Sequence, residues 1–140
     1  MKILLAVDDS KCAMRAVTHV IDNVGMFGPD PEIHLLHVER PLPGRATAAA
    51  GRTVVQSYYL EQSTKALSRA SRALTRSGIQ YKPVHLIGDP GETIAAYSKR
   101  EKFPLVVIGS HGQGALSSMV LGSVAHKVLA LCDTPALIIR

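Results

Sequence analysis

The sequence is poor in aromatic residues and in cysteine, and both shortages limit what it can be. It contains no tryptophan, two phenylalanines and four tyrosines among its 140 residues. A core must therefore be built from Val, Ile, Leu and Ala, as in a sheet covered by helices. Its two cysteines, Cys12 and Cys132, are far apart and have neither metal-ligand spacing nor the pattern of a secreted disulfide framework.

Long hydrophobic runs are also missing. The first apolar run, Ile3 to Val7, is too short for a signal peptide and is followed at once by Asp8 and Asp9. No stretch is long enough to span a bilayer. We therefore expect a cytoplasmic protein with no membrane partner.

A dense run of basic charge is absent as well. The 16 Lys and Arg residues outnumber the 11 Asp and Glu residues and give a formal net charge of +5, but they are scattered along the chain. Few aromatic residues are available to stack on bases. We interpret the basic residues as solvated helix faces and expect no nucleic-acid partner.

What the sequence does contain is an alternation of apolar runs and helical patterns. Ile3 to Val7, Ile33 to Val38 and Leu105 to Ile108 are continuous apolar runs, which are typical of strands buried on both faces. Two more strands are predicted at Ile79 to Ile87 and at Ala136 to Ile139.

Helical patterns separate these strands. The first helix is predicted after Ser10, a possible N-cap, and ends by Gly25. A long helix is predicted from Thr53 to Ser77, another from Pro90 to Lys102, and a last one after Gly122. The side of the long helix that we expect to be buried carries Leu60, Leu67, Ala70 and Leu74.

The stretch from Pro41 to Arg52 is rich in Pro, Gly and Ala and has no periodicity, so we expect a loop. Arg45 and Arg52 bracket it. They either fold over a bound anion or remain in solvent.

This alternation predicts a single-domain α/β fold over residues 1–140, a doubly wound parallel sheet with right-handed crossovers and helices on both faces. Pro83 indicates that its strand lies at an edge of the sheet. Ligands of such folds bind at the carboxyl ends of the strands, where the strand order reverses.

A glycine-rich segment, Gly109-Ser110-His111-Gly112-Gln113-Gly114, directly follows the strand that ends at Ile108, and Gly122-Ser123 precedes the last helix. Glycines permit positive φ and close approach of a ligand to the backbone. Exposed N–H groups of such a loop and of a helix N-terminus together form an anion site. The alternative is a connecting loop in which the glycines serve turn geometry alone.

Two better-known phosphate motifs are absent. The Walker pattern G-x-x-x-x-G-K-[ST] does not occur. No G-x-G-x-x-G follows the first strand, which argues against a dinucleotide-binding fold of the Rossmann type.

The spacing Gly109-x2-Gly112-x9-Gly122-Ser123 resembles the G-x2-G-x9-G-[ST] pattern of the ATP-binding branch of the universal stress proteins. The resemblance covers the whole chain. It implies a five-stranded parallel sheet of order 3-2-1-4-5, of the adenine nucleotide alpha hydrolase type, and ATP as ligand. Mg²⁺ accompanies ATP in some relatives.

Residues are carried over from the family by their position. The end of the first strand would border adenine and ribose, with Asp8 as a polar contact, although Asp8 is also a plausible helix-start residue. His111 either donates to a phosphate or faces solvent. The nucleotide-binding residues implied are Ala6, Val7, Asp8, Val38, Gly109, Ser110, His111, Gly112, Gly114, Gly122, Ser123 and Val124.

No catalytic or metal-ligating residue stands out. We see no general base beside the loop, so any ATP hydrolysis or autophosphorylation is expected to be weak. His34 and His37 alternate with leucines in a strand and are interpreted as packed residues rather than metal ligands. The expected role is a nucleotide-dependent switch in a stress response.

Two other functions remain open at this point. The same fold can serve as a protein-interaction module without nucleotide. A phosphorylated receiver domain is the other, with Asp8 and Asp9 as its acidic pair and Asp89 as the acceptor. The chain lacks the lysine and the final helix that such domains place after the fifth strand.

The last strand indicates a partner. In the order 3-2-1-4-5, Ala136 to Arg140 lies at an edge, and an exposed apolar edge is an aggregation hazard unless it is covered. The family covers it by pairing two subunits. We therefore expect a homodimer with a two-fold axis near Ile138.

Overall fold

The computed structural model describes residues 1–114 and 121–140. Residues 115–120, inside the predicted phosphate loop, lie outside the described residues. Five parallel strands form one sheet of order β3-β2-β1-β4-β5, which confirms the predicted fold class. The strands are β1 (Lys2–Ala6), β2 (Glu32–Glu39), β3 (Tyr81–Ile87), β4 (Leu105–Gly109) and β5 (Ala136–Ile139).

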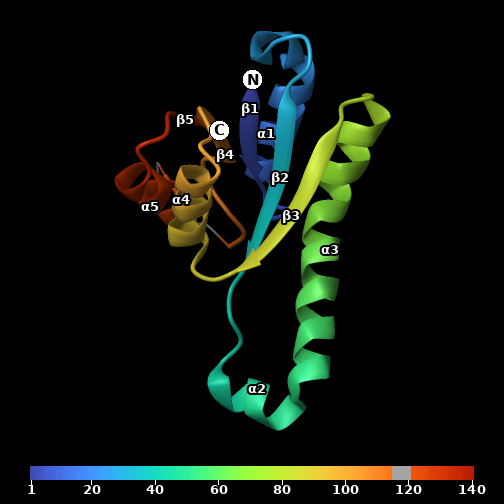
Figure 1. Cartoon of the computed structure of the whole chain (residues 1–140), viewed down its shortest axis with the longest axis vertical. Coiled ribbons are helices and arrows are strands. Elements are labelled where there is room, and N and C mark those ends of the chain that lie inside the picture. Colours follow the sequence, from blue (N-terminus) through green and yellow to red (C-terminus); the bar gives the residue numbers. More distant parts are fainter. Residues whose placement is uncertain (115–120) are drawn as a thin grey trace.

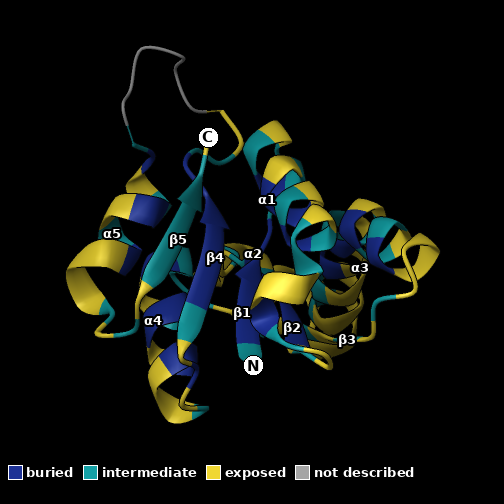
Figure 2. Ribbon diagram, turned by 90° about the horizontal axis from the view of Figure 1, so that it is seen from above, coloured by how far each residue is buried: buried dark blue, intermediate teal, exposed yellow. Residues whose placement is uncertain are grey.

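Helices cover both faces of the sheet (Figure 2). The helices are α1 (Lys11–Asp22), α2 (Gly44–Ala50), α3 (Arg52–Arg76), α4 (Pro90–Arg100) and α5 (Ser123–Leu131), with a short 3-10 turn at Val24–Phe27. α1 and α3 pack together on one face, and α4 packs against α5 on the other. The fold is therefore doubly wound, as the alternation of patterns predicts.

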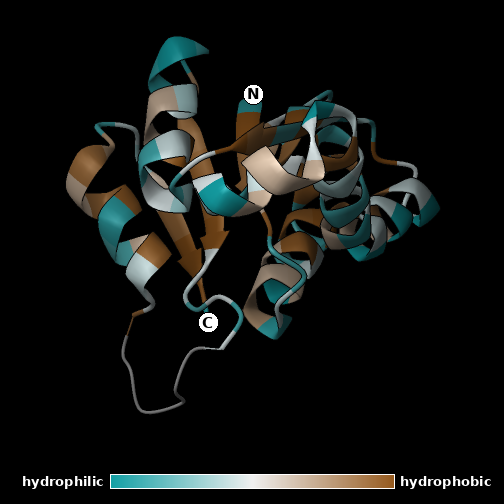
Figure 3. Cartoon of the chain, turned by 90° about the horizontal axis from the view of Figure 1, so that it is seen from below, coloured by the Kyte–Doolittle hydropathy of each residue, from teal (hydrophilic) through white to brown (hydrophobic). Residues whose placement is uncertain are grey.

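The continuous apolar strands supply two separate cores. In β1, Ile3 and Leu5 face the core under α1 and α3, whereas Leu4 and Ala6 face the core under α4 and α5. Because successive side chains of a strand point to opposite faces, a strand between two helix layers must be apolar throughout. Figure 3 shows the hydrophobic strands in the middle and hydrophilic outer surfaces on the helices.

Side-chain caps define where two of the helices begin. Ser10 Oγ accepts a hydrogen bond from the Ala13 N–H, 3.1 Å away, at the start of α1. Asp89 does the same for the Glu92 N–H at the start of α4, again at 3.1 Å. Both caps follow strands, so they direct the helices back over the sheet from its carboxyl edge.

The prediction of a loop from Pro41 to Arg52 is wrong. Most of it forms α2, and α3 begins directly after Gly51. α2 has no buried residue, so it leaves no apolar stripe in the sequence from which a helix could be recognised. α2 and the first turns of α3 project beyond the carboxyl edge of the sheet (Figure 1).

The projection also explains why one predicted core residue is misplaced. Leu60 is 59% exposed, whereas the remaining residues of its predicted stripe are buried together with Ser63. Only the C-terminal part of α3 reaches the sheet. Pro83 lies in the edge strand β3, as predicted. Among the described residues, no helix is both long and apolar enough to cross a membrane.

Candidate functional site

A cavity of about 620 Å³ opens at the carboxyl ends of β1, β2 and β4. Its size falls within the range of roughly 300–1,000 Å³ that is usual for small-molecule sites. From β1 the chain adds β2 and β3 on one side of the sheet, and it then crosses to β4 and β5 on the other side of β1, so the strand order reverses at β1. The cavity is therefore at the switch point where open α/β sheets bind ligands.

The cavity collects nearly all of the predicted site residues. Ser110 is the exception. Those that line the cavity are Ala6, Val7, Asp8, Val38, Gly109, His111, Gly112, Gly114, Gly122, Ser123 and Val124. They come from four separate parts of the chain, which the sheet brings to one edge.

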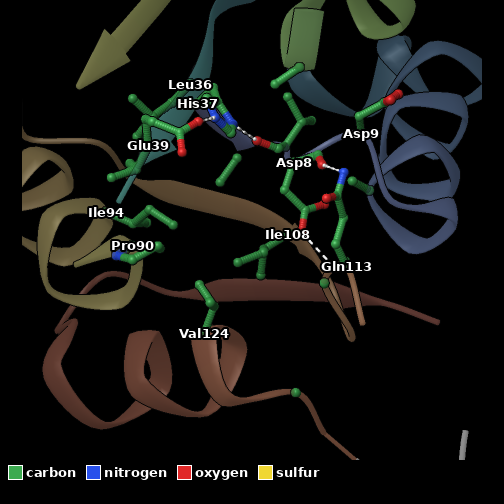
Figure 4. A pocket seen from close by; sticks show the side chains of 18 of the residues that line it. Asp8, Asp9, Leu36, His37, Glu39, Pro90, Ile94, Ile108, Gln113 and Val124 are labelled. Carbon is green, nitrogen blue, oxygen red and sulfur yellow. Dashed lines mark hydrogen bonds and ion pairs between the residues drawn. The ribbon is translucent and has the colours of Figure 1, made fainter. Parts of the chain in front are cut away.

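One end of the cavity is apolar. Leu36 of β2, Pro90 and Ile94 of α4 and Ile108 of β4 lie around this end (Figure 4), and Val38 also lines the cavity. Apolar side chains of this kind suit the faces of an aromatic ring. Pro90, Ile94 and Ile108 were missed from the sequence, since spacing along the chain does not indicate which helix faces which strand end.

The other end is built from the glycine segment together with Gly122, and Gly109, Gly112 and Gly122 leave space for neighbouring atoms. A Cβ at Gly109 would lie 2.6 Å from the Cys12 carbonyl carbon, so β4 and α1 can approach only without it. At Gly112 it would lie 2.6 Å from Asp8 Oδ2, and at Gly122 it would lie 3.0 Å from the Ser110 carbonyl oxygen. Among the glycines of this segment, only Gly114 has a positive φ, at 73°. Close packing rather than unusual backbone conformation explains the motif.

Asp8 ties this segment to the end of β1. Its Oδ1 accepts from the Ser10 N–H at 3.1 Å, and its Oδ2 accepts from the Gln113 N–H at 3.1 Å. The Gln113 side-chain amide donates in return to the Asp8 carbonyl oxygen at 2.7 Å. Asp8 therefore has a structural role beside any contact with a ligand, and Gln113 is a site residue that the sequence reasoning did not single out.

Ser110 is turned away from the cavity. It is buried, its Oγ lies 3.0 Å from His111 Nδ1, and its N–H donates to the Ile139 carbonyl oxygen at 2.7 Å. The Ser110 carbonyl oxygen accepts from the Gly122 N–H, also at 2.7 Å. Ser110 thus joins the end of β5 to the start of α5 and does not present its hydroxyl to the cavity.

α5 aims its N-terminus at the cavity. Its N-cap is Gly122, which has no side chain to accept from the first N–H groups, and Ser123 and Val124 line the cavity. The His126 N–H is already bonded to the Gly122 carbonyl oxygen at 2.9 Å. The uncapped first turn therefore offers donors and a positive dipole end to an anion.

His37 has more than a packing role. It is buried, as predicted, and its Nδ1–H donates to the Val7 carbonyl oxygen at 2.9 Å, which links the ends of β1 and β2. Its Nε2 lies 3.2 Å from Glu39 Oε2, and both side chains line the cavity. They flank Val38, but adjacent strand residues point to opposite faces, so the predicted position of Val38 did not identify them.

Ion pairs hold the helices of one face together beside the cavity. Lys127 Nζ lies 3.1 Å from Asp89 Oδ1, and Arg40 lies 3.7 Å from Asp89 Oδ2. The Glu92 N–H and the Lys127 ammonium hold the pKa of Asp89 below its ordinary value of 3.8. The same pairing with Asp89 raises the pKa of Lys127. Asp89 is thus engaged as a helix cap and ion-pair partner.

Other residues singled out in the sequence lie away from the cavity or pair elsewhere. Arg45 and Arg52 belong to the projecting helices and do not line it. Asp9 lines it, and its carboxylate pairs with Arg69 at 3.2 Å. His34 is buried between Tyr97, 2.8 Å away, and Glu32, 2.9 Å away, as a packed residue. Among the described residues, no cluster of His, Cys, Asp and Glu has the arrangement of a metal site.

Comparison with known proteins places this site in a family context. A sequence profile of the Universal stress protein family matches residues 1–140. Universal stress protein YxiE of Bacillus subtilis is 28% identical over 147 residues, which cover 99% of this chain and 98% of YxiE. The structure of MJ0577 from Methanocaldococcus jannaschii matches with a TM-score of 0.80 at 26% identity, covering 99% of this chain and 94% of MJ0577.

Some structures with this fold contain adenine nucleotides. The universal stress protein of Archaeoglobus fulgidus in complex with dAMP matches with a TM-score of 0.72 at 20% identity, covering 100% of this chain and 98% of that protein. Others hold AMP, in a family member from Arabidopsis thaliana, or cAMP. At these identities the likeness shows the shared fold. Because the family profile spans residues 1–140 and the sheet has the same strand order, the chain belongs to the universal stress protein family.

Proposed function

We propose that this protein binds ATP in the cavity at the carboxyl edge of the sheet and acts as a nucleotide-dependent switch in a stress response. The observation that carries the proposal is the division of the cavity into an apolar end, formed by β2 and α4, and an end built from the glycine segment and the uncapped start of α5. A base and a phosphate chain need these two environments side by side.

The ligand would lie across the switch point. Its adenine would rest between Val38 and Ile94, and its phosphates would accept from backbone N–H groups near Gly112 and at Ser123. The adenine nucleotides found in structures of this fold support the choice of base, and the G-x2-G-x9-G-[ST] spacing supports a phosphate chain. Conformational change on binding would supply the switch, with at most slow hydrolysis.

Two measurements test this function. The purified protein is denatured, and mass spectrometry identifies any small molecule that is released. Calorimetry then compares ATP with GTP, after nucleotide carried through purification has been removed. We expect an adenine nucleotide in the first measurement and preferential ATP binding in the second. No released nucleotide together with no heat of binding would contradict the proposal and favour a nucleotide-independent interaction module.

We also propose that two copies pair through β5. The two edges of the sheet differ: β3 carries Lys82 and Pro83, which discourage pairing, whereas Ala136 to Ile139 are all apolar. A two-fold axis near Ile138 would place the same strand of each copy side by side. Light scattering after size exclusion should give the mass of a dimer, and a monomer at micromolar concentration would contradict the pairing.

A further inference from the structure

Strand β2 carries two pairs of histidine and glutamate, and the two pairs differ in the protons that their contacts need. His34 Nε2 lies 2.9 Å from Glu32 Oε1, and His37 Nε2 lies 3.2 Å from Glu39 Oε2. In each pair the residues are two apart, so both side chains leave the strand on the same face. Both rings are buried. The partner of the second ring nitrogen, Nδ1, therefore decides which charge each ring must carry.

A neutral ring satisfies the contacts of His34. Its Nε2–H donates to Glu32, and its Nδ1 accepts from the Tyr97 hydroxyl, 2.8 Å away. A hydroxyl is able to donate or to accept, so Tyr97 adapts to the ring. Lys2 Nζ lies 3.9 Å from the same oxygen of Glu32 and offers it a positive charge. His34 therefore needs no additional proton.

A neutral ring does not satisfy the contacts of His37. Its Nδ1 lies 2.9 Å from the Val7 carbonyl oxygen, which only accepts, so Nδ1 must carry a proton. Its Nε2 faces Glu39 (Figure 4), and in a neutral ring this nitrogen would be an acceptor opposite an ionised carboxylate, which is also an acceptor. The contact needs one more proton, and imidazole is a stronger base than a carboxylate. The geometry is thus that of an imidazolium paired with a carboxylate.

This pair lies in the wall of the candidate site, because His37 and Glu39 both line the cavity. With its proton the pair has no net charge, and without it the pair adds one negative charge to the wall. We propose that His37 and Glu39 form a proton-binding pair, and that release of this proton weakens the binding of anionic ligands in the cavity. The charge of the pair stands on hydrogen-bond geometry, whereas its effect on a nucleotide rests on the proposed function. Acidification would then favour the nucleotide-bound form.

Other charged and titratable groups lie around the pair. His85 of β3 is the neighbour of His37 in the register of the sheet, and its side chain is exposed. Lys65 of α3, which packs against β2, is exposed and lines the cavity. The remaining charged or titratable residues of the described cavity wall are Asp8, which accepts two backbone N–H groups, Asp9, paired with Arg69, Arg40, paired with Asp89, and His111. Because solvent screens exposed charges, the contact with Glu39 dominates the charge of the His37 ring.

Nuclear magnetic resonance of the ring nitrogens tests the difference between the two pairs. The chain has six histidines, whose ring signals are assigned through bonds to the backbone. Over a pH titration, we expect His37 to carry its second ring proton at pH values at which His34 is neutral. In Glu39→Gln, whose amide is able to donate to Nε2, His37 should become neutral at a lower pH than in the wild type. Two rings that titrate together, or no change in Glu39→Gln, would overturn the proposed pair.

Calorimetry with ATP over the same pH range tests the effect on binding. His37→Asn keeps a side-chain N–H but does not titrate, so Glu39 contributes its charge at every pH. At the acid end of the His37 titration, the wild type should bind ATP about threefold more tightly than His37→Asn, and at the alkaline end the two should bind equally. Titration of ATP itself affects both proteins and cancels in the ratio. His85→Asn is the matched control, because the exposed His85 lies beside His37 and should not affect the ratio.

Glu39→Gln supplies a second variant, for which damage to the fold predicts the opposite result. At the alkaline end, it should bind ATP about threefold more tightly than the wild type, because its pair has no charge there. A gain of affinity is not expected from a loosened site. Adenosine, which has no phosphate charge, should bind all four proteins with the same affinity over this range. An equal pH dependence for adenosine would overturn charge as the cause.

The outcomes separate this inference from the function on which it rests. If ATP and adenosine fail to bind at every pH, the proposed function is overturned and the effect on binding with it, while the ring signals still decide the charge of His37. If ATP binds but the ratio between the wild type and His37→Asn is constant over the titration, the nucleotide function stands and the coupling to the proton is overturned.

Discussion

Two glycine-bearing segments leave the carboxyl edge of the sheet, and their glycines differ in how closely they are packed. After β4, a Cβ at Gly109 or Gly122 would meet neighbouring backbone at 3.0 Å or less. After β2, a Cβ at Gly44 or Gly51 would meet nothing within 4 Å. The first segment is packed against α1 and β1, whereas the second forms the projecting helix α2 and the turn into α3. Gly109 and Gly122 therefore mark close packing, whereas Gly51, which has a φ of 83°, marks the turn between α2 and α3.

The largest effect that would test this contrast is expected at Gly109. In Gly109→Ala, the new Cβ would lie 2.6 Å from the Cys12 carbonyl carbon and 2.8 Å from the Ala13 nitrogen, so β4 and α1 must separate. We expect a loss of about 3 kcal/mol in the free energy of unfolding, measured by urea denaturation. Gly25→Ala is the control, because a Cβ there meets nothing within 4 Å. Equal losses in the two variants would contradict the packing explanation.

Gly122 should show a smaller loss of stability and a large loss of binding. Its new Cβ would lie 3.0 Å from the Ser110 carbonyl oxygen and 3.1 Å from the His111 Cα, within the segment itself. In Gly122→Val we expect about 1–2 kcal/mol of destabilisation. ATP affinity should fall at least about tenfold, because the start of α5 is displaced. Unchanged affinity in calorimetry would mean that this segment does not hold the ligand.

Asp89 links the two segments. It pairs with Arg40, at the start of the segment after β2, and with Lys127 on α5, the helix after the glycine segment. The pKa of Asp89 is lowered in the folded protein, so its ionised carboxylate stabilises the fold at pH values above the ordinary pKa of the group. As the pH falls through the lower pKa of the folded state, this stabilisation is lost. Asp89→Asn retains a helix cap but cannot ionise.

Near neutral pH, the wild type should therefore be more stable than Asp89→Asn by up to about 1 kcal/mol. The difference should close as the solution is acidified below pH 3.8, the ordinary pKa of the group. Urea denaturation of both proteins over a pH series measures it. A difference that does not vary with pH would show that the ion pairs contribute nothing.

In the segment after β2, replacing a glycine with alanine should slightly increase the free energy of unfolding. Gly44 is the first residue of α2, and a Cβ there has open space around it. Gly44→Ala should raise the free energy of unfolding by about 0.5 kcal/mol, because the unfolded chain loses freedom. Urea denaturation beside Gly109→Ala provides the direct comparison. If Gly44→Ala and Gly109→Ala both destabilise the protein, the two segments do not differ in how closely their glycines are packed.

The smallest effect is expected from the arginines of the projection. Arg45 and Arg52 lie outside the cavity lining, and exposed charges at a distance are screened by salt. Replacing both with alanine should change ATP affinity by less than about twofold at physiological ionic strength. A tenfold loss in calorimetry would show that the projection folds over the nucleotide after all.

Local patterns account for the parts that sequence reasoning predicted correctly. The continuous apolar run of β1 follows from burial on both faces, and Ser10 and Asp89 are recognisable caps, because each of these signals depends on neighbours within a few residues. α2 had no such signal. With nothing buried, it lacks the periodicity that distinguishes a helix from a loop.

The candidate site was only partly predictable for a related reason. The glycine spacing located the segment, but it could not show that the Ser110 backbone hydrogen-bonds to Ile139 and Gly122, or that Gln113 hydrogen-bonds to Asp8. These contacts join residues far apart in the chain. Their geometry follows from how β1, β4 and β5 are aligned, which no local pattern records.

The sequence by itself determined the order of the strands and of the helices that pack on the sheet, the two-sided burial of the sheet and the place of the glycine segment, since all three depend on periodicity and on residue type along the chain. Only the tertiary structure decided what each glycine makes room for, that Asp8 anchors the segment, and that the segment after β2 stands clear of the body. These features depend on contacts between segments that are far apart in the sequence. Such contacts form only when the sheet and both helix layers pack together.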